Sequence, residues 1–155
     1  MDMVRILTIA FAAAGLAVAA DFSIQIGNPV AAFAANTVNP QKVKAAVMAV
    51  RAQGCADPAK ARFTGTATRM NGTSRESAAL GFIEGATPGS FTVVGGWAGS
   101  WLAVITGDCQ GSKAGALVPV NAQGSYVREA SQFFNHAPTD AEMETMMKTV
   151  MGGLR

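Results

Sequence analysis

The sequence predicts a mostly β domain, an antiparallel sandwich or barrel that is followed by a C-terminal amphipathic helix. Between residues 62 and 120, short apolar or alternating segments are separated by glycine-rich turns, which is typical of all-β sandwiches and barrels. After residue 138, apolar residues instead recur at the three- and four-residue spacings of a helix. The length of 155 residues fits one domain, and a composition with 50% hydrophobic and 14% charged residues is that of a packed protein.

The β segments can be placed one by one. Residues 62–70 alternate in polarity and lead into Asn71-Gly72, a dipeptide typical of a tight hairpin turn. A return strand is expected over residues 77–83. Pro119 has no backbone N–H, so its strand is expected at a sheet edge. The other expected strands are residues 91–94, 101–106 and 116–120.

Residues 41–53 fit two structures. The segment is flanked by helix signals, namely an N-cap residue, a proline at the first helical position and a terminal glycine: Asn39, Pro40 and Gly54. A strand that ends near Cys55 is the other interpretation. With an additional helix at 41–53, the fold class would be α+β instead of mostly β.

The C-terminal segment, residues 137–155, is predicted to form a helix that packs on a sandwich of residues 35–136. Thr139 and Glu142 form a capping box, in which each side chain accepts a hydrogen bond from the other residue's backbone N–H. The apolar residues that follow share one stripe, which must pack on another part of the protein. These residues are Met143, Met146, Met147, Val150 and Met151.

Residues 1–34 are predicted to be a signal peptide. Arg5 precedes about 15 uncharged residues, which suits a signal peptide and is short of the roughly 20 residues of a membrane span. Small residues Ala17 and Ala19 suit cleavage after residue 19 or 20, whereas Ala32 and Ala34 suit cleavage after residue 34. We therefore expect a periplasmic or secreted protein with no stable membrane span after cleavage. An uncleaved membrane anchor is the alternative.

Cys55 and Cys109 are the only cysteines in the sequence. An exported chain meets an oxidising compartment, so the two are expected to form a disulfide bond. Closing a loop of about 55 residues would contribute roughly 4 kcal/mol in the chain-entropy model.

Several function classes are not expected. The net charge is +2 without any basic run, so nucleic acid is a poor candidate partner. His136 is the only histidine, and no serine lies in a G-x-S-x-G motif, so we expect no enzymatic activity and no cofactor. A zinc site is not expected, because pairing of the cysteines leaves too few ligands.

The methionines allow a copper hypothesis. Thioether sulfur is a soft ligand for Cu(I), and His136 could converge on one ion with Met143, Met146 and Met147. Methionine is also an adaptable filler of apolar cores, and we favour this interpretation for the helix stripe. No metal site is therefore assigned.

One stretch of the chain resembles a known family. Pro88-Gly89 before Phe91, and then Gly99-Ser100-Trp101, resemble the Pro-Gly-x-aromatic and Gly-x-Trp pairing of the small exported immunoglobulin-like domains called YtkA-like. The resemblance covers about 20 residues, Thr87 to Val104. It implies an immunoglobulin-like sandwich with Trp101 at its centre, and it favours a strand over residues 41–53. The histidine-containing metal site of related copper-carrier domains is missing from this sequence, and the C-terminal helix is extra.

The expected function is a non-enzymatic extracytoplasmic module that binds an unknown envelope protein or a small ligand. Trp97, which precedes Trp101 across a glycine-rich bend, is a candidate partner anchor. A periplasmic copper-handling carrier that uses the C-terminal methionines is the alternative.

Overall fold

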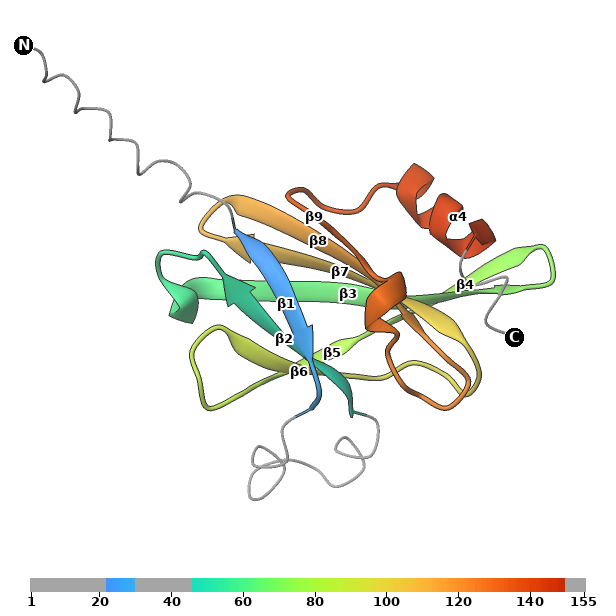
Figure 1. Ribbon diagram of the computed structural model, residues 1–155, viewed down its shortest axis with the longest axis horizontal. Helices are drawn as coiled ribbons and strands as arrows, with labels where there is room; N and C mark the ends of the chain where they lie inside the picture. Colours follow the sequence, from blue (N-terminus) through green and yellow to red (C-terminus); the bar gives the residue numbers. More distant parts are fainter. Residues whose placement is uncertain (1–21, 30–45, 150–155) are drawn as a thin grey trace, which may run out of the picture.

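The computed structural model describes residues 22–29 and 46–149, which form a β-sandwich with one C-terminal helix (Figure 1). A sheet of four strands packs on a sheet of five, and every strand pairing is antiparallel. The predicted mostly β sandwich is therefore confirmed. Within the described ranges, no helix has the length and apolar character needed to cross a membrane.

The strand order is that of an immunoglobulin sandwich. In the four-stranded sheet the order is β1 (Ser23–Gly27), β2 (Ala46–Gln53), β6 (Ser90–Val94) and β5 (Gly81–Glu84). In the five-stranded sheet it is β4 (Ser74–Ala79), β3 (Ala61–Asn71), β7 (Trp101–Cys109), β8 (Ser112–Val120) and β9 (Gln132–Phe134). The first sheet corresponds to the A-B-E-D order and the second to C′-C-F-G, with β9 added beyond strand G.

The main core lies between the inner faces of the two sheets. Trp101 is 2% exposed there, as expected from the sequence, and Val50 and Ile105 are completely buried. Phe63 stacks on Phe82 with ring centres 6.2 Å apart and meets Phe91 edge-on at 5.4 Å. Side chains from both sheets therefore share one apolar cluster.

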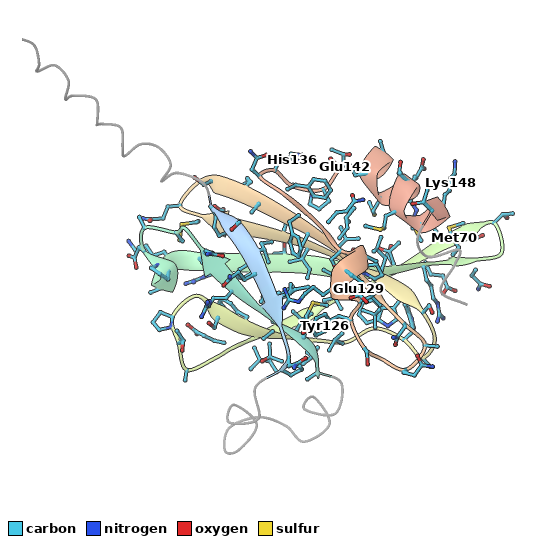
Figure 2. All side chains as sticks on the ribbon, viewed as in Figure 1. Met70, Tyr126, Glu129, His136, Glu142 and Lys148 are labelled. Atoms are coloured by element: carbon cyan, nitrogen blue, oxygen red, sulfur yellow. A yellow bond between two sulfur atoms is a disulfide. The ribbon has the colours of Figure 1, made fainter. Side chains whose placement is uncertain are left out.

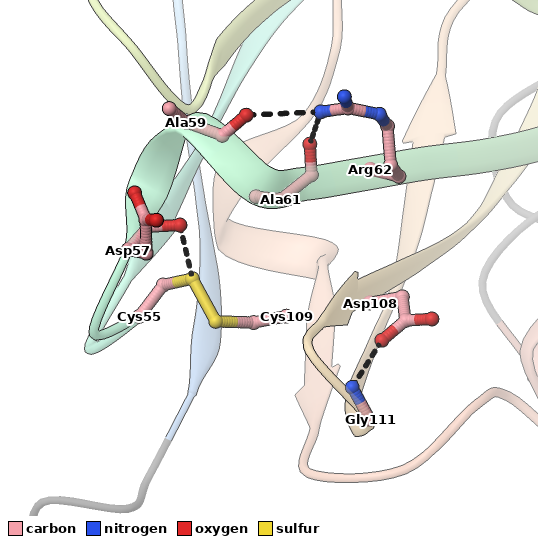
Figure 3. Close-up of a disulfide and its surroundings, with 8 residues drawn as sticks. All are labelled: Cys55, Asp57, Ala59, Ala61, Arg62, Asp108, Cys109 and Gly111. Atoms are coloured by element: carbon pink, nitrogen blue, oxygen red, sulfur yellow. Dashed lines mark hydrogen bonds between the residues drawn. A yellow bond between two sulfur atoms is a disulfide. The ribbon is translucent and has the colours of Figure 1, made fainter.

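The disulfide joins the two sheets at one end of the sandwich (Figure 3). Cys55 follows β2 and Cys109 ends β7, with Cα atoms 5.8 Å apart. The predicted bridge is therefore confirmed.

The hairpin next to the disulfide is held by Asp108. Its carboxylate accepts a hydrogen bond from the backbone N–H of Gly111 (2.9 Å) and a further one from Lys113. These two hydrogen bonds hold the pKa of the Asp108 carboxyl below its usual value.

The sandwich begins earlier than the predicted boundary at residue 35. Strand β1 lies inside the segment assigned to the signal peptide, yet it pairs with β2 from Ser23–Gln53 to Gly27–Ala49. Its inward residues are buried in the core: Phe22, Ile24 and Ile26. The placement of the sandwich boundary at residue 35 was therefore wrong, because alternating apolar residues after Asp21 belong to a strand.

The ambiguous segment 41–53 contains strand β2, and residues 41–45 lie outside the described residues. The helical alternative is wrong for residues 46–53. This strand pairs with β1 on one side and β6 on the other, and those pairings override local signals for a helix.

Two details of the β3–β5 region differ from the prediction. The hairpin turn consists of Gly72 and Thr73, because Asn71 is the last residue of β3 and pairs with Ser74. Gly72 has a φ of +67°, which suits the first central position of a type II′ turn.

The expected strand 77–83 is two strands in different sheets. Strand β4 pairs with β3, whereas β5 pairs with β6. Leu80 lies between them, is buried, and donates its backbone N–H to the carbonyl of Gly65 (3.0 Å). The chain therefore crosses from one sheet to the other at Leu80.

Strand β8 is not a sheet edge, contrary to the expectation from Pro119. It pairs with β7 along its length and with β9 over Gly115–Leu117. The Pro119 carbonyl accepts a hydrogen bond from Val127 (2.8 Å), and the N and C=O of a strand residue point to the same side. The backbone nitrogen of Pro119 therefore points away from β7. It lies past the last residue of β8 that pairs with β9, so no strand hydrogen bond is lost there.

Helix α4 (Asp140–Thr149) covers the outer face of the five-stranded sheet. The Thr139–Glu142 capping box is confirmed, with reciprocal hydrogen bonds of 2.9 and 3.2 Å. Met146 is 1% exposed and packs with Leu102 and Leu117, which point outward from β7 and β8. The helix is thus packed on the sandwich as predicted, whereas Val150 and Met151 lie outside the described residues.

Candidate binding site

A hollow of about 490 Å³ lies on the four-stranded sheet. Its walls come from β1, β2 and β6, from the turn at residues 85–87 and from Arg128. The volume falls in the range of about 300–1,000 Å³ that is usual for small-molecule sites. Strands of three different sequence regions therefore build one concave surface.

Strand register places three polar residues in a row across the hollow. Gln25 of β1 pairs with Arg51 of β2, and Arg51 pairs with Ser90 of β6. Val50, the neighbour of Arg51, is completely buried, and side chains alternate along a strand. The row therefore projects from the outer face of the sheet, where Arg51 Nη2 donates a hydrogen bond to Gln25 Oε1 (2.8 Å).

A second arginine reaches the hollow from the connection after β8. The short 3₁₀ helix η3 (Arg128–Ala130) carries Arg128, whose Nη2 donates to the carbonyl of Ile26 (2.6 Å). The nearby Tyr126 hydroxyl donates to Asn28 Oδ1 (3.0 Å). These contacts attach the connection to the outer edge of β1, where they also cover an otherwise unpaired strand edge.

The charge around the hollow is positive. Among the described residues, Arg51 and Arg128 are its only charged lining residues, and that part of the lining includes no aspartate, glutamate, lysine, histidine or cysteine. The ion pairs found among residues 22–29 and 46–149 use other side chains. Both guanidinium groups instead contact neutral oxygen atoms, and guanidinium stays protonated in proteins.

Sequence reasoning did not find this site. Arg51 has the local pattern of an ordinary outward-facing strand residue, and Arg128 lies in an irregular connection. The two arginines are 77 positions apart, so no local spacing relates them. The one available signal was the isolated charge of Arg51 within the apolar run of residues 45–52.

The residues considered for copper lie at the start and on the inner face of α4. His136 is exposed, with Nδ1 2.8 Å from the Ala137 carbonyl and Nε2 3.4 Å from Glu142 Oε2. Figure 2 shows His136 beside Glu142 at the start of this helix. In the described part of the chain, no three His, Cys, Asp or Glu residues form a group suited to a metal ion.

The three methionines share an apolar environment. Met146 is buried, and Met143 and Met147 pack around it against the same cluster. The hydrophobic side chains packed with them include Leu102, Leu117 and Phe134. Such surroundings suit core methionines, and a role in copper binding stays an untested hypothesis.

Trp97 is half-buried beside the main core. The guanidinium carbon of Arg69 lies 4.4 Å from the centre of its ring, in a cation–π contact. Arg69 also donates to Glu76 Oε1 (2.7 Å), and this hydrogen bond, with one from Asn71, holds the pKa of Glu76 below its usual value. One face of Trp97 is thus covered, and its role as a partner anchor stays a prediction.

The fold and the hollow define a small immunoglobulin-like β-sandwich with a positively charged recess on one sheet. Comparison of the chain with protein-family models, curated proteins and solved structures gave no match. The resemblance to YtkA-like domains therefore stays an expectation from the sequence.

Proposed function

We propose that the protein is a non-enzymatic extracytoplasmic binding module that holds a small ligand in the hollow on its four-stranded sheet. The observation that carries this proposal is the convergence of Arg51 and Arg128 on one recess of ligand size. Pockets with a few convergent polar groups are the usual binding sites of small molecules.

The chemistry of the lining supports binding instead of catalysis. Proton transfer needs a group whose pKa lies near the working pH, such as a histidine or a carboxylate. The hydroxyl groups of Thr87, Ser90 and Thr92 have no such base among the lining residues of ranges 22–29 and 46–149, and guanidinium does not release its proton. The recess can therefore hold and orient a ligand.

Export of the protein is supported by the disulfide, and the position of β1 bears on where a signal peptide would be cleaved. Disulfides persist mainly in oxidising compartments outside the cytoplasm. Cleavage after residue 19 or 20 would leave Phe22 and all of β1 in the mature protein, whereas cleavage after residue 34 would remove them. We therefore propose the earlier site.

A small-molecule screen by thermal shift tests the binding proposal. Ala49 lines the hollow, so Ala49→Phe should fill it. Thr64→Phe is the matched control, because it adds the same ring at an exposed position of β3, outside the hollow. Compounds should raise the melting temperature of wild type and Thr64→Phe but not of Ala49→Phe. If no compound stabilises wild type more than Ala49→Phe, the proposed function is wrong.

A further inference from the structure

We infer that the ligand of the hollow is a small organic oxyanion, one that carries a carboxylate or a phosphate group. The inference rests on the proposed function, because it names the chemistry of what the hollow binds. It is carried by two guanidinium groups that reach one recess from segments 77 positions apart, without a carboxylate partner among the described residues.

The contacts of the two arginines orient them without neutralising them. Gln25 Oε1 and the Ile26 carbonyl each accept one hydrogen bond from a guanidinium nitrogen. A guanidinium group has five N–H donors, and its planar fork matches the two oxygens of a carboxylate or phosphate. Each of these guanidinium groups therefore has N–H donors beyond the one used in this hydrogen bond, and these can bind a ligand.

The other lining groups fit an organic skeleton. Thr87 and Ser90 also line the hollow, and a hydroxyl group can donate to further oxygen atoms of a ligand. Ala49 and Ala86 contribute apolar surface. The volume of about 490 Å³ is more than one inorganic phosphate would fill, which favours a ligand with a carbon skeleton. A cationic ligand would meet two like charges, and the described lining residues offer it no carboxylate.

Calorimetric titrations of the oxidised protein test this inference. The probes are succinate for carboxylates, glycerol 3-phosphate for organic phosphates, inorganic phosphate, neutral glycerol and cationic choline. We expect at least one organic oxyanion to bind at least about tenfold more tightly than glycerol or choline, because hydrogen bonds to charged groups are strong ones. The succinate and glycerol 3-phosphate arms separate the two oxyanion classes.

Arg51→Gln is the deciding variant, because Arg51 is exposed and its loss leaves the edge of β1 attached. It should weaken oxyanion binding at least about tenfold. Arg62→Gln is the matched control, since Arg62 is also exposed and, within the described part of the chain, its side chain donates hydrogen bonds to the backbone carbonyls of Ala59 and Ala61. Arg62→Gln should leave the dissociation constant unchanged. Arg128→Gln, checked by its melting temperature, should behave like Arg51→Gln.

Two results would overturn the inference. One is equal weakening by Arg62→Gln, which would show an effect of net charge alone. The other is a ligand that Ala49→Phe excludes from the hollow but whose binding Arg51→Gln does not change. In this second case the proposed function would stand and only the ligand class would be wrong. Failure of every probe and every screened compound would instead reject the proposed function itself.

Discussion

Removal of β1 should cost the sandwich most of its stability. The side chains of Phe22, Ile24 and Ile26 are 3%, 4% and 6% exposed. Burial of one such side chain contributes about 1.5–3 kcal/mol, so the three together contribute about 5–9 kcal/mol. Whole domains are stable by only about 5–15 kcal/mol. A chain that starts at residue 35 should therefore be unfolded or close to it.

The comparison uses two oxidised chains, one starting at residue 21 and the other at residue 35. Urea unfolding followed by tryptophan fluorescence gives the free energy of unfolding of each. Single substitutions within the longer chain locate the effect. Ile24→Ala should cost about 2–5 kcal/mol, whereas Gln25→Ala, at an exposed position of the same strand, should stay within about 0.5 kcal/mol.

The intact mass of the protein recovered from the cell envelope tests the same reasoning in the cell. We expect a mature chain that begins at residue 20 or 21. Equal stability of the two truncated chains would show that β1 is not part of the cooperative core. An exported chain that begins at residue 35 would refute the proposed cleavage site.

The disulfide, the bend before β7 and helix α4 each give one further prediction. Replacing both bridge cysteines with alanine should lower the free energy of unfolding by up to about 4 kcal/mol, because the bridge closes a long loop with a sequence separation of 54; a loss below about 1 kcal/mol in urea unfolding would contradict this. Gly96→Ala should lower the melting temperature more than Gly99→Ala. Both positions have positive φ, +105° and +87°, but only a Cβ at Gly96 would overlap the Trp101 ring; equal shifts would contradict the packing argument. Met146→Leu should cost less than about 1.5 kcal/mol and leave any Cu(I) binding unchanged in a titration, and loss of tight Cu(I) binding would support the copper hypothesis.

The features that the sequence determined by itself are local or have a single solution. The Thr139–Glu142 capping box is written in four consecutive residues, and it starts a helix in the structure. Two cysteines allow only one intramolecular pairing. Strand segments around Trp101 follow from apolar runs bounded by glycine, because side-chain alternation and turn conformation act over neighbouring residues.

Other features were decided only by contacts between distant segments. Strand β1 lies beside a signal-like apolar run, and its place in the sheet becomes evident only from its register with β2. The exchange of sheets at Leu80 depends on which neighbours β4 and β5 find, namely β3 and β6. Strand pairing is non-local, so a single continuous apolar pattern can belong to either sheet.

The candidate site belongs entirely to this second group. Arg51 and Arg128 line one hollow because β2 presents the first on its outer face and the connection after β8 carries the second past the edge of β1. Each residue alone has the pattern of an ordinary solvent-exposed arginine. Their shared chemistry arises from tertiary packing, which sets the distance and direction between groups that the sequence separates by 77 positions.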